Sequence, residues 1–119
     1  MTLLKPLSAR RFDAYRVLLE LIARVDPLIK RIAKHDQALA DQLARALPSS
    51  LQNFAEGLRR TGKDRAHLLT VALGSTEEIR SILDVSWVKH IITAQEAASH
   101  DEVADRACAM LYRIRQRLA

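Results

Sequence analysis

Apolar residues recur at alternating steps of three and four along most of the chain, and this spacing constrains the fold more than any other feature. Within residues 9–34 the series is Tyr15, Leu18, Ile22, Val25, Ile29 and Ile32. Such steps place every member on one side of an α-helix, where together they form a buried seam. No segment alternates apolar and polar residues as a half-buried strand would. The pattern predicts an all-α protein.

The composition agrees with helices. Apolar residues make up 49% of the chain but aromatic residues only 4%, and the commonest residues, Leu and Ala, are good helix formers. A chain of 119 residues is long enough to bury roughly two-thirds of its extended surface around one core. Residues 1–119 are therefore expected to form a single domain.

Four helices are predicted, over residues 9–34, 36–57, 64–89 and 95–118. Pro27 interrupts the first helix and Pro48 lies inside the second, so each is expected to bend. Asp36 and Asp64 are the expected N-caps of the second and third helices. Short connections make consecutive helices antiparallel neighbours, which predicts an up-down-up-down antiparallel four-helix bundle.

The lone cysteine, Cys108, cannot form an internal disulfide, which fits a reducing compartment. The first residues lack the apolar core of a signal peptide, and no apolar run approaches the ~20 residues that span a bilayer. A cytoplasmic protein without a membrane partner is expected.

The formal net charge of +5 is unevenly distributed. Residues 1–35 carry eight Lys/Arg against three Asp/Glu, which accounts for the whole surplus. The predicted topology brings the N-terminus, the connection after the second helix and the C-terminus to one end. That end would gather the candidate nucleic-acid-binding residues Arg10, Arg11, Arg59, Arg60, Lys63, Arg65, Arg113, Arg115 and Arg117, together with Lys5. The other end would hold His35, Asp36 and His90, with Asp101, Glu102 and Asp105 nearby.

The stretch GLRRTGKD at residues 57–64 fits G-x-x-x-x-G-K, the start of a phosphate-binding loop. Asp64 stands where that loop needs a Ser or Thr for magnesium, and its charge would repel phosphate. A helix precedes the stretch where a strand is required. Gly57 is instead expected to cap the second helix at C′, and Gly62 to turn the chain toward the third. The basic residues here favour a polynucleotide over a nucleoside triphosphate.

A polar stripe accompanies the apolar seams. It comprises Ser49, Asn53 and Glu56 on the second helix, with Ser75 and Glu78 on the third. The stripe is interpreted as a hydrogen-bonded network that fixes helix register or a subunit interface, with a small-molecule or catalytic site as the alternative. Gly74 fits the first interpretation, because a glycine inside a helix usually permits close helix approach.

No catalytic, metal or cofactor site is predicted. The histidines form neither H-E-x-x-H nor Glu-x-x-His, so His35, His90 and His100 are expected to be solvated helix-end residues. Cys108 borders the fourth seam and is expected to pack in the core. The two Tyr and one Trp are too few for a base-stacking platform.

Ser49, Asn53-x-x-Glu56-Gly57, Arg60 and Ala72-x-Gly74-Ser75-x-x-Glu78 resemble the S-x-x-x-N-x-A-E-G…R…A-x-G-S-x-x-E pattern of a bacterial four-helix-bundle family. That family includes proteins encoded by intervening sequences in 23S ribosomal RNA genes and accessory proteins of diversity-generating retroelements. The chain departs from the pattern in the position of Pro48. It departs again in the turn at residues 87–92, where many members have Gly-Tyr.

The resemblance implies a homopentamer and does not imply a catalytic activity. Retroelement members of the family bind a reverse transcriptase and nucleic acid, so RNA, DNA or a reverse transcriptase are the candidate partners. Three hypotheses follow. The first is a non-enzymatic oligomer that binds nucleic acid through its basic end. The second is a protein-interaction scaffold, for which Leu21, Leu28 and Leu69, outside the seams, would supply exposed apolar contacts. The third is a ligand- or metal-binding bundle.

Overall fold

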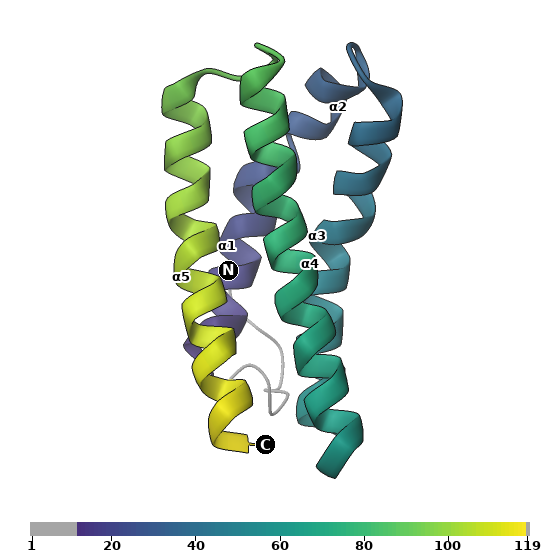
Figure 1. Ribbon diagram of the computed structural model, residues 1–119, viewed down its shortest axis with the longest axis vertical. Helices are drawn as coiled ribbons and strands as arrows, with labels where there is room; N and C mark the ends of the chain where they lie inside the picture. The colour runs from purple at the N-terminus through teal and green to yellow at the C-terminus, as the bar shows by residue number, and fades with distance from the viewer. Residues whose placement is uncertain (1–11, 119) are drawn as a thin grey trace.

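The computed structural model describes residues 12–118, and every regular element in this range is an α-helix (Figure 1). The helices are α1 (Asp13–Val25), α2 (Leu28–Ala33), α3 (Gln37–Leu58), α4 (Gly62–Val88) and α5 (Ala94–Leu118). They pack as a helical bundle in which α4 lies between α3 and α5, and α1 contacts both α5 and α3. The predicted all-α class is confirmed.

The predicted first helix is broken into α1 and α2 at Asp26 and Pro27. Proline has no backbone N–H to donate and its ring crowds the preceding turn, so the ladder stops at the bond from the N–H of Asp26 to the carbonyl of Ile22 (2.9 Å). The chain resumes at α2, where the N–H of Ile29 bonds the carbonyl of Asp26 (3.1 Å). The interruption at Pro27 is confirmed, whereas the single bent helix is wrong.

The start of α3 is as predicted. Asp36 has extended backbone, and its Oδ1 accepts a hydrogen bond from the N–H of Leu39 at 3.0 Å. This bond satisfies one of the free donors of the first turn. The helix remains continuous through Pro48.

The passage from α3 to α4 differs from the prediction in two places. Helix α3 runs on to Leu58 with Arg59 as its C-cap, so Gly57 is a buried helical residue and not a C′ cap. Helix α4 begins two residues earlier than expected, which makes Thr61 the N-cap and puts Asp64 in the first turn. An acidic residue there still complements the helix dipole. Gly62 turns the chain with φ of 58°.

The α4–α5 connection is a left-handed turn closed by hydrogen bonds. His90 has φ of 61°, the N–H of Ile91 bonds the carbonyl of Ser86 (2.9 Å), and that of His90 bonds the carbonyl of Trp87 (2.9 Å). These two bonds form a Schellman motif, whose C′ position is usually glycine. Ile91 and Ile92 follow it into the core.

Helix α5 then starts with a capping box. The N–H of Thr93 donates to Oε1 of Glu96 (2.9 Å), and the N–H of Glu96 donates to Oγ1 of Thr93 (3.0 Å). The Thr-x-x-Glu spacing was present in the sequence and could have located this helix start.

One hydrophobic core runs through the bundle. Its largest fully buried side chains include Phe54, Leu18, Leu21, Leu43, Leu69 and Leu111. Leu21, Leu28 and Leu69 are 0%, 7% and 1% exposed, so the expectation that they form an outer contact surface is wrong. The core needs a wider apolar face on each helix than the narrow seams, which is ordinary for globular helices. Among residues 12–118, no helix has the length and apolar character needed to cross a membrane.

Candidate nucleic-acid interface

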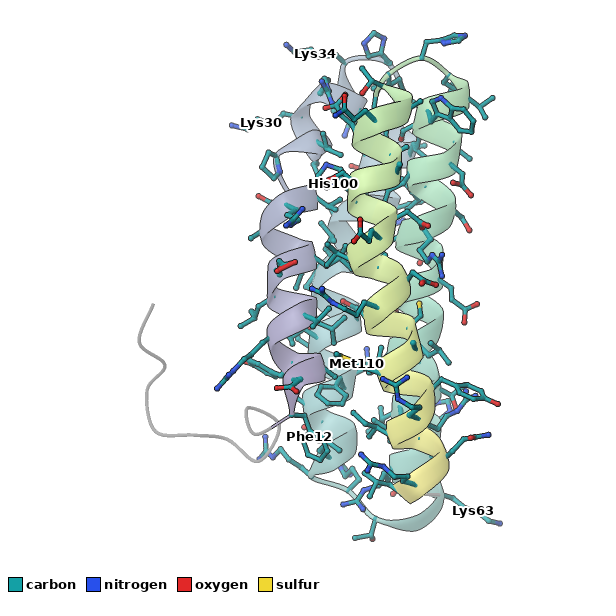
Figure 2. The ribbon with its side chains drawn as sticks, turned by 90° about the vertical axis from the view of Figure 1, so that its left-hand side faces the viewer. Phe12, Lys30, Lys34, Lys63, His100 and Met110 are labelled. Atoms are coloured by element: carbon teal, nitrogen blue, oxygen red, sulfur yellow. The ribbon has the colours of Figure 1, made fainter. Side chains whose placement is uncertain are left out.

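The α3–α4 connection and the last turns of α5 lie at one end of the bundle (Figure 1). Figure 2 places Lys63 at the tip of this end. Nη1 of Arg115, near the end of α5, lies 3.5 Å from Oγ1 of Thr70, two turns into α4. The basic residues of both segments therefore share one region, which we call the cationic end: Arg59, Arg60, Lys63, Arg65, Arg113, Arg115 and Arg117. Arg10 and Arg11 lie outside the described residues.

Two of these arginines are engaged by Glu56. Its carboxylate lies 2.8 Å from Nη2 of Arg60 and 3.7 Å from Nη1 of Arg59. The hydrogen bond from Arg60 holds the pKa of Glu56 below its usual value. Glu56 thus offsets part of the positive charge here. Its partners are arginines of the cationic end and not the other residues of the predicted polar network.

Arg65 and Arg115 have structural contacts of their own. The guanidinium of Arg65 donates to the carbonyls of Gly57 (3.4 Å) and Leu58 (3.2 Å), which are free acceptors at the end of α3. Arg115 lies over the ring of Tyr112 at 5.3 Å from its centroid. Both side chains are partly buried, so they are less available to a ligand than their charge suggests.

Lys63, Arg113 and Arg117 are the open cations. All three are exposed, and none forms an ion pair with another residue between 12 and 118. Each can approach a phosphate without first breaking a salt bridge. They are the strongest candidates for contact with an anionic polymer.

The opposite end is not the acidic surface that the sequence predicts. Lys30 of α2 and the C-cap of that helix, Lys34, lie there (Figure 2). Lys89 pairs with Asp36 at 2.7 Å, and Arg31 pairs with Glu96. Two cations of the N-terminal surplus, Lys30 and Arg31, belong to α2 and a third, Lys34, is its C-cap; the break at Pro27 leaves that helix at the far end. Part of the N-terminal basic surplus therefore lies at the end opposite the cationic end.

Only three of the five residues predicted to form the polar network are hydrogen-bonded to one another. The hydroxyls of Ser49 and Ser75 lie 2.8 Å apart and join α3 to α4. The amide of Asn53 donates to the carbonyl oxygen (2.8 Å) and the hydroxyl (3.0 Å) of Ser49. These three side chains form a partly buried cluster that favours one register of α3 against α4.

Glu78 and Gly74 stand apart from this cluster. Glu78 is exposed and has no hydrogen bond or ion pair with another residue in the described range. Gly74 is exposed, and a Cβ added there would meet no atom within 4 Å. Within one chain, Gly74 therefore does not permit a close helix approach. That role belongs to Gly57, where an added Cβ would lie 3.2 Å from Cδ2 of Leu69.

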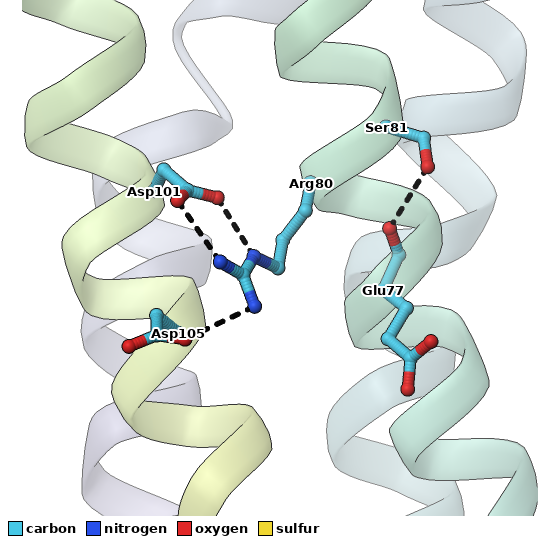
Figure 3. Close-up of polar contacts among 5 residues, drawn as sticks. All are labelled: Glu77, Arg80, Ser81, Asp101 and Asp105. Carbon is cyan, nitrogen blue, oxygen red and sulfur yellow. Dashed lines mark hydrogen bonds and ion pairs between the residues drawn. The ribbon is translucent and has the colours of Figure 1, made fainter.

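An ion-pair clamp between α4 and α5 went unpredicted. Nε and Nη2 of Arg80 donate to the two carboxylate oxygens of Asp101 at 2.7 and 3.0 Å, and Nη1 lies 3.2 Å from Asp105 (Figure 3). The hydrogen bond to Asp101 raises the pKa of Arg80 above its ordinary value. Asp101 and Asp105 stand four residues apart, which places both on one helix face and was the signal available in the sequence.

The histidines and the cysteine have different surroundings. His35, His67 and His90 are exposed, whereas His100 is partly buried, so the expectation of a solvated His100 is wrong. Burial lowers the pKa of His100, and the nearby cation Arg24 lowers it further. Cys108 packs against the core as expected, and burial raises the pKa of its thiol. Residues 12–118 hold no group of three or more His, Cys, Asp or Glu arranged to bind a metal ion.

These features define a class: a small all-α bundle protein with a cationic end. The family model for the 23S rRNA-intervening sequence protein matches residues 10–113, and the chain belongs to this family. Its fold is similar to the crystal structure of a protein with unknown function from the S23 ribosomal protein family of Bacteroides thetaiotaomicron VPI-5482. The TM-score is 0.77 at 20% identity, over 85% of this chain and 96% of that one. At this identity the likeness shows a shared fold. Among proteins with curated descriptions, none matches the chain.

Proposed function

We propose that this protein is a non-enzymatic oligomer that binds the phosphate backbone of RNA or DNA through its cationic end. One observation carries the proposal: Lys63, Arg113 and Arg117 are exposed at the same end without ion pairs to other described residues. Phosphates are contacted chiefly by Lys and Arg, and such contacts need no sequence-specific geometry. Membership of a family named for 23S rRNA intervening sequences also supports binding to nucleic acid.

The proposal includes an assembly. With α1 and α2 counted as one interrupted segment, we propose an up-down-up-down four-helix bundle that assembles as a homopentamer, as the family resemblance implies. A ring of copies would present its cationic ends on one face, so contacts that are weak singly would act together on one polynucleotide.

The test is a salt titration of binding to a labelled duplex. Three phosphate contacts from one protomer give a slope of about −2.7 in log K against log salt, or roughly 40-fold weaker binding at 200 mM than at 50 mM, and contacts from further protomers of the ring make the slope steeper. Reversing Lys63, Arg113 and Arg117 to Glu should abolish binding. The matched control reverses Lys30 and Lys34, two exposed lysines at the opposite end. If both variants bind like the wild type, or lose binding equally, the cationic end is not the interface.

A protein-interaction scaffold is the second candidate, and a different surface favours it. Val85, Trp87 and Val88, at the end of α4, are 41%, 47% and 68% exposed. Trp87 also lines an open pocket of about 240 Å³, whose other lining residues are Asp84, Ala94, Ala97, Ala98 and Asp101. Exposed apolar groups within a polar rim are typical of contact surfaces, and a reverse transcriptase or a second copy would be a partner of this kind.

Light scattering tests this second candidate. The wild type should be oligomeric at micromolar concentration, and Val88→Glu should dissociate it or release a protein partner. Tyr112→Glu, at a similarly exposed position on α5 (46%), is the control. A monomeric wild type that binds no protein would exclude the scaffold.

A further inference from the structure

An open pocket of about 290 Å³ lies within the cationic end, between the start of α1 and the last turns of α5. Its walls come from two segments that are far apart in sequence: Phe12 and Asp13 on one side, and Met110, Arg113, Ile114 and Arg117 on the other. Figure 2 shows the labelled Phe12 and Met110 in this lower part of the bundle, between α1 and α5. The volume is at the lower end of the roughly 300–1,000 Å³ typical of ligand sites, so the pocket suits one small ring.

The pocket combines an aromatic wall with an apolar base. Phe12 is partly exposed, and its ring makes an edge-to-face contact with the fully buried Phe54, with centroids 6.1 Å apart and planes at 89°. That contact holds the Phe12 ring at the pocket. Met110 and the buried Ile114 supply apolar surface from α5. An aromatic ring beside aliphatic groups is a surface on which a planar ligand can stack.

The polar groups of the pocket have opposite charges. Arg113 and Arg117 stand four residues apart on α5, and both are exposed without an ion pair to another described residue. Asp13, in the first turn of α1, provides a carboxylate on the facing wall. A free phosphate would meet repulsion from Asp13, and a purely apolar ligand would leave three charges unused. The wall suits a ligand with an anionic part and a separate hydrogen-bond donor.

We propose that this pocket takes one unstacked nucleobase of a single strand, with its flanking phosphates on Arg113 and Arg117. The base stacks on Phe12, and its exocyclic amino group donates to the carboxylate of Asp13, as cytosine N4 does to acidic side chains. A duplex hides its bases in the stack and cannot fill the pocket. The inference rests on the proposed function, and it names single strands with amino-bearing bases as the preferred class.

This chemistry predicts a preference among bases and a preference for single strands over a duplex. Cytosine and adenine present an amino donor, whereas the one N–H on the pairing edge of uracil lies between two carbonyl oxygens that a carboxylate repels. Oligo(C) should therefore bind more tightly than oligo(U), and both more tightly than a duplex of the same length. Because the pocket contacts base and phosphate, oligo(dC) should bind about as well as oligo(C). A stronger affinity for oligo(C) would add a contact to the 2′-hydroxyl and would also support the pocket.

The experiment measures fluorescence anisotropy with oligo(C), oligo(U), oligo(dC) and a duplex at one salt concentration. Phe12→Leu keeps apolar volume but removes the aromatic ring, so single-strand affinity should fall about fivefold or more with duplex affinity unchanged. Asp13→Asn should remove the preference for oligo(C) over oligo(U). Lys63→Gln, an exposed cation outside the pocket, should weaken all four ligands by the same factor. Thermal unfolding of each variant checks that the contact of Phe12 with Phe54 has not cost the fold.

The outcomes separate this inference from the proposed function. If the wild type binds none of the four ligands, the proposed function itself fails. If it binds single strands and duplex equally, and Phe12→Leu and Asp13→Asn change nothing, the base pocket is overturned while backbone binding stands. The same holds if these two variants alter only the unfolding temperature, because Phe12 and Asp13 would then be structural.

Discussion

Gly57 of α3 lies directly against Leu69 of α4: a Cβ placed on Gly57 would be 3.2 Å from Cδ2 of Leu69 and 3.3 Å from Cβ of Leu68. Gly57 and Leu69 are both buried, so the missing side chain is what lets the two helices approach at this level. Gly74, one helix later, has no such neighbour. The two glycines therefore have different surroundings, and substitution by alanine should change the stability differently at the two positions.

Gly74→Ala should stabilise the monomer by up to about 1 kcal/mol, because alanine gains helix propensity without meeting an atom. Gly57→Ala gains the same propensity but must displace Leu68 and Leu69, so its free energy of unfolding should be lower than that of Gly74→Ala by at least about 1 kcal/mol. Urea unfolding of both variants measures the difference. Equal stabilisation would contradict the close approach at Gly57, and loss of the oligomer in Gly74→Ala would place Gly74 in a subunit interface.

His90→Gly should stabilise the protein by about 0.5–1 kcal/mol. His90 is exposed and has φ of 61°, a conformation that costs a side-chain-bearing residue about 1–2 kcal/mol and costs glycine little, although glycine loses more entropy on folding. The control is His67→Gly, at an exposed position inside α4, which should destabilise by about 0.3 kcal/mol, the difference in helix propensity between histidine and glycine. Chemical denaturation of the two variants measures the change in the free energy of unfolding for each. A destabilised His90→Gly would show that the histidine side chain itself stabilises the turn.

The helices were predictable because their signals are local. The seam through Leu18 and Val25, the N-cap Asp36 and the interruption at Pro27 depend on residues within one or two turns, and each is confirmed. The error at Gly57 arose where a tertiary contact competes with a local preference. A glycine at this position predicts the end of a helix, but Gly57 packs against Leu69 and α3 continues past it.

The cationic end could be predicted only as a set of charges. Sequence gives the number of arginines near a chain reversal, but it does not say which of them a carboxylate or a carbonyl already occupies. The pairing of Glu56 with Arg60, and the capping of α3 by Arg65, separate engaged cations from open ones. The pocket beside Phe12 could not be predicted from the sequence either, because it forms only where α1 and α5 pack against one another.

Arg80 and Asp101 should show measurable coupling in a double-mutant cycle with Arg80→Gln and Asp101→Asn. The pair is bidentate, with side chains 31% and 37% exposed, so we expect about 1 kcal/mol after discounting for solvent screening. The comparison cycle is Arg106 with Glu20, a single 3.3 Å contact between side chains 52% and 40% exposed, whose coupling should be smaller. Equal coupling in the two cycles would mean that the clamp between α4 and α5 is no stronger than a surface ion pair.

His100 should make the protein less stable as pH falls from about 8 to about 5.5. Burial, with the cations Arg24 and Arg31, lowers the pKa of His100 in the folded protein, while Glu96 opposes the shift. Above the unfolded pKa of about 6.5 the imidazole is neutral in both states, so the full stability is present there. As pH falls toward the lowered folded pKa, the unfolded chain takes up the proton first and the free energy of unfolding decreases.

The pKa of Glu96 is also lowered, chiefly by the backbone of Thr93. The stability that Glu96 contributes is lost in a separate pH range, around and below the ordinary pKa of a glutamate. Denaturation midpoints measured across the pH range of the His100 titration should decline in the wild type and in the control His67→Gln, whose histidine is exposed, and should be flatter in His100→Gln. A decline of the same size in His100→Gln would assign the pH dependence to other groups.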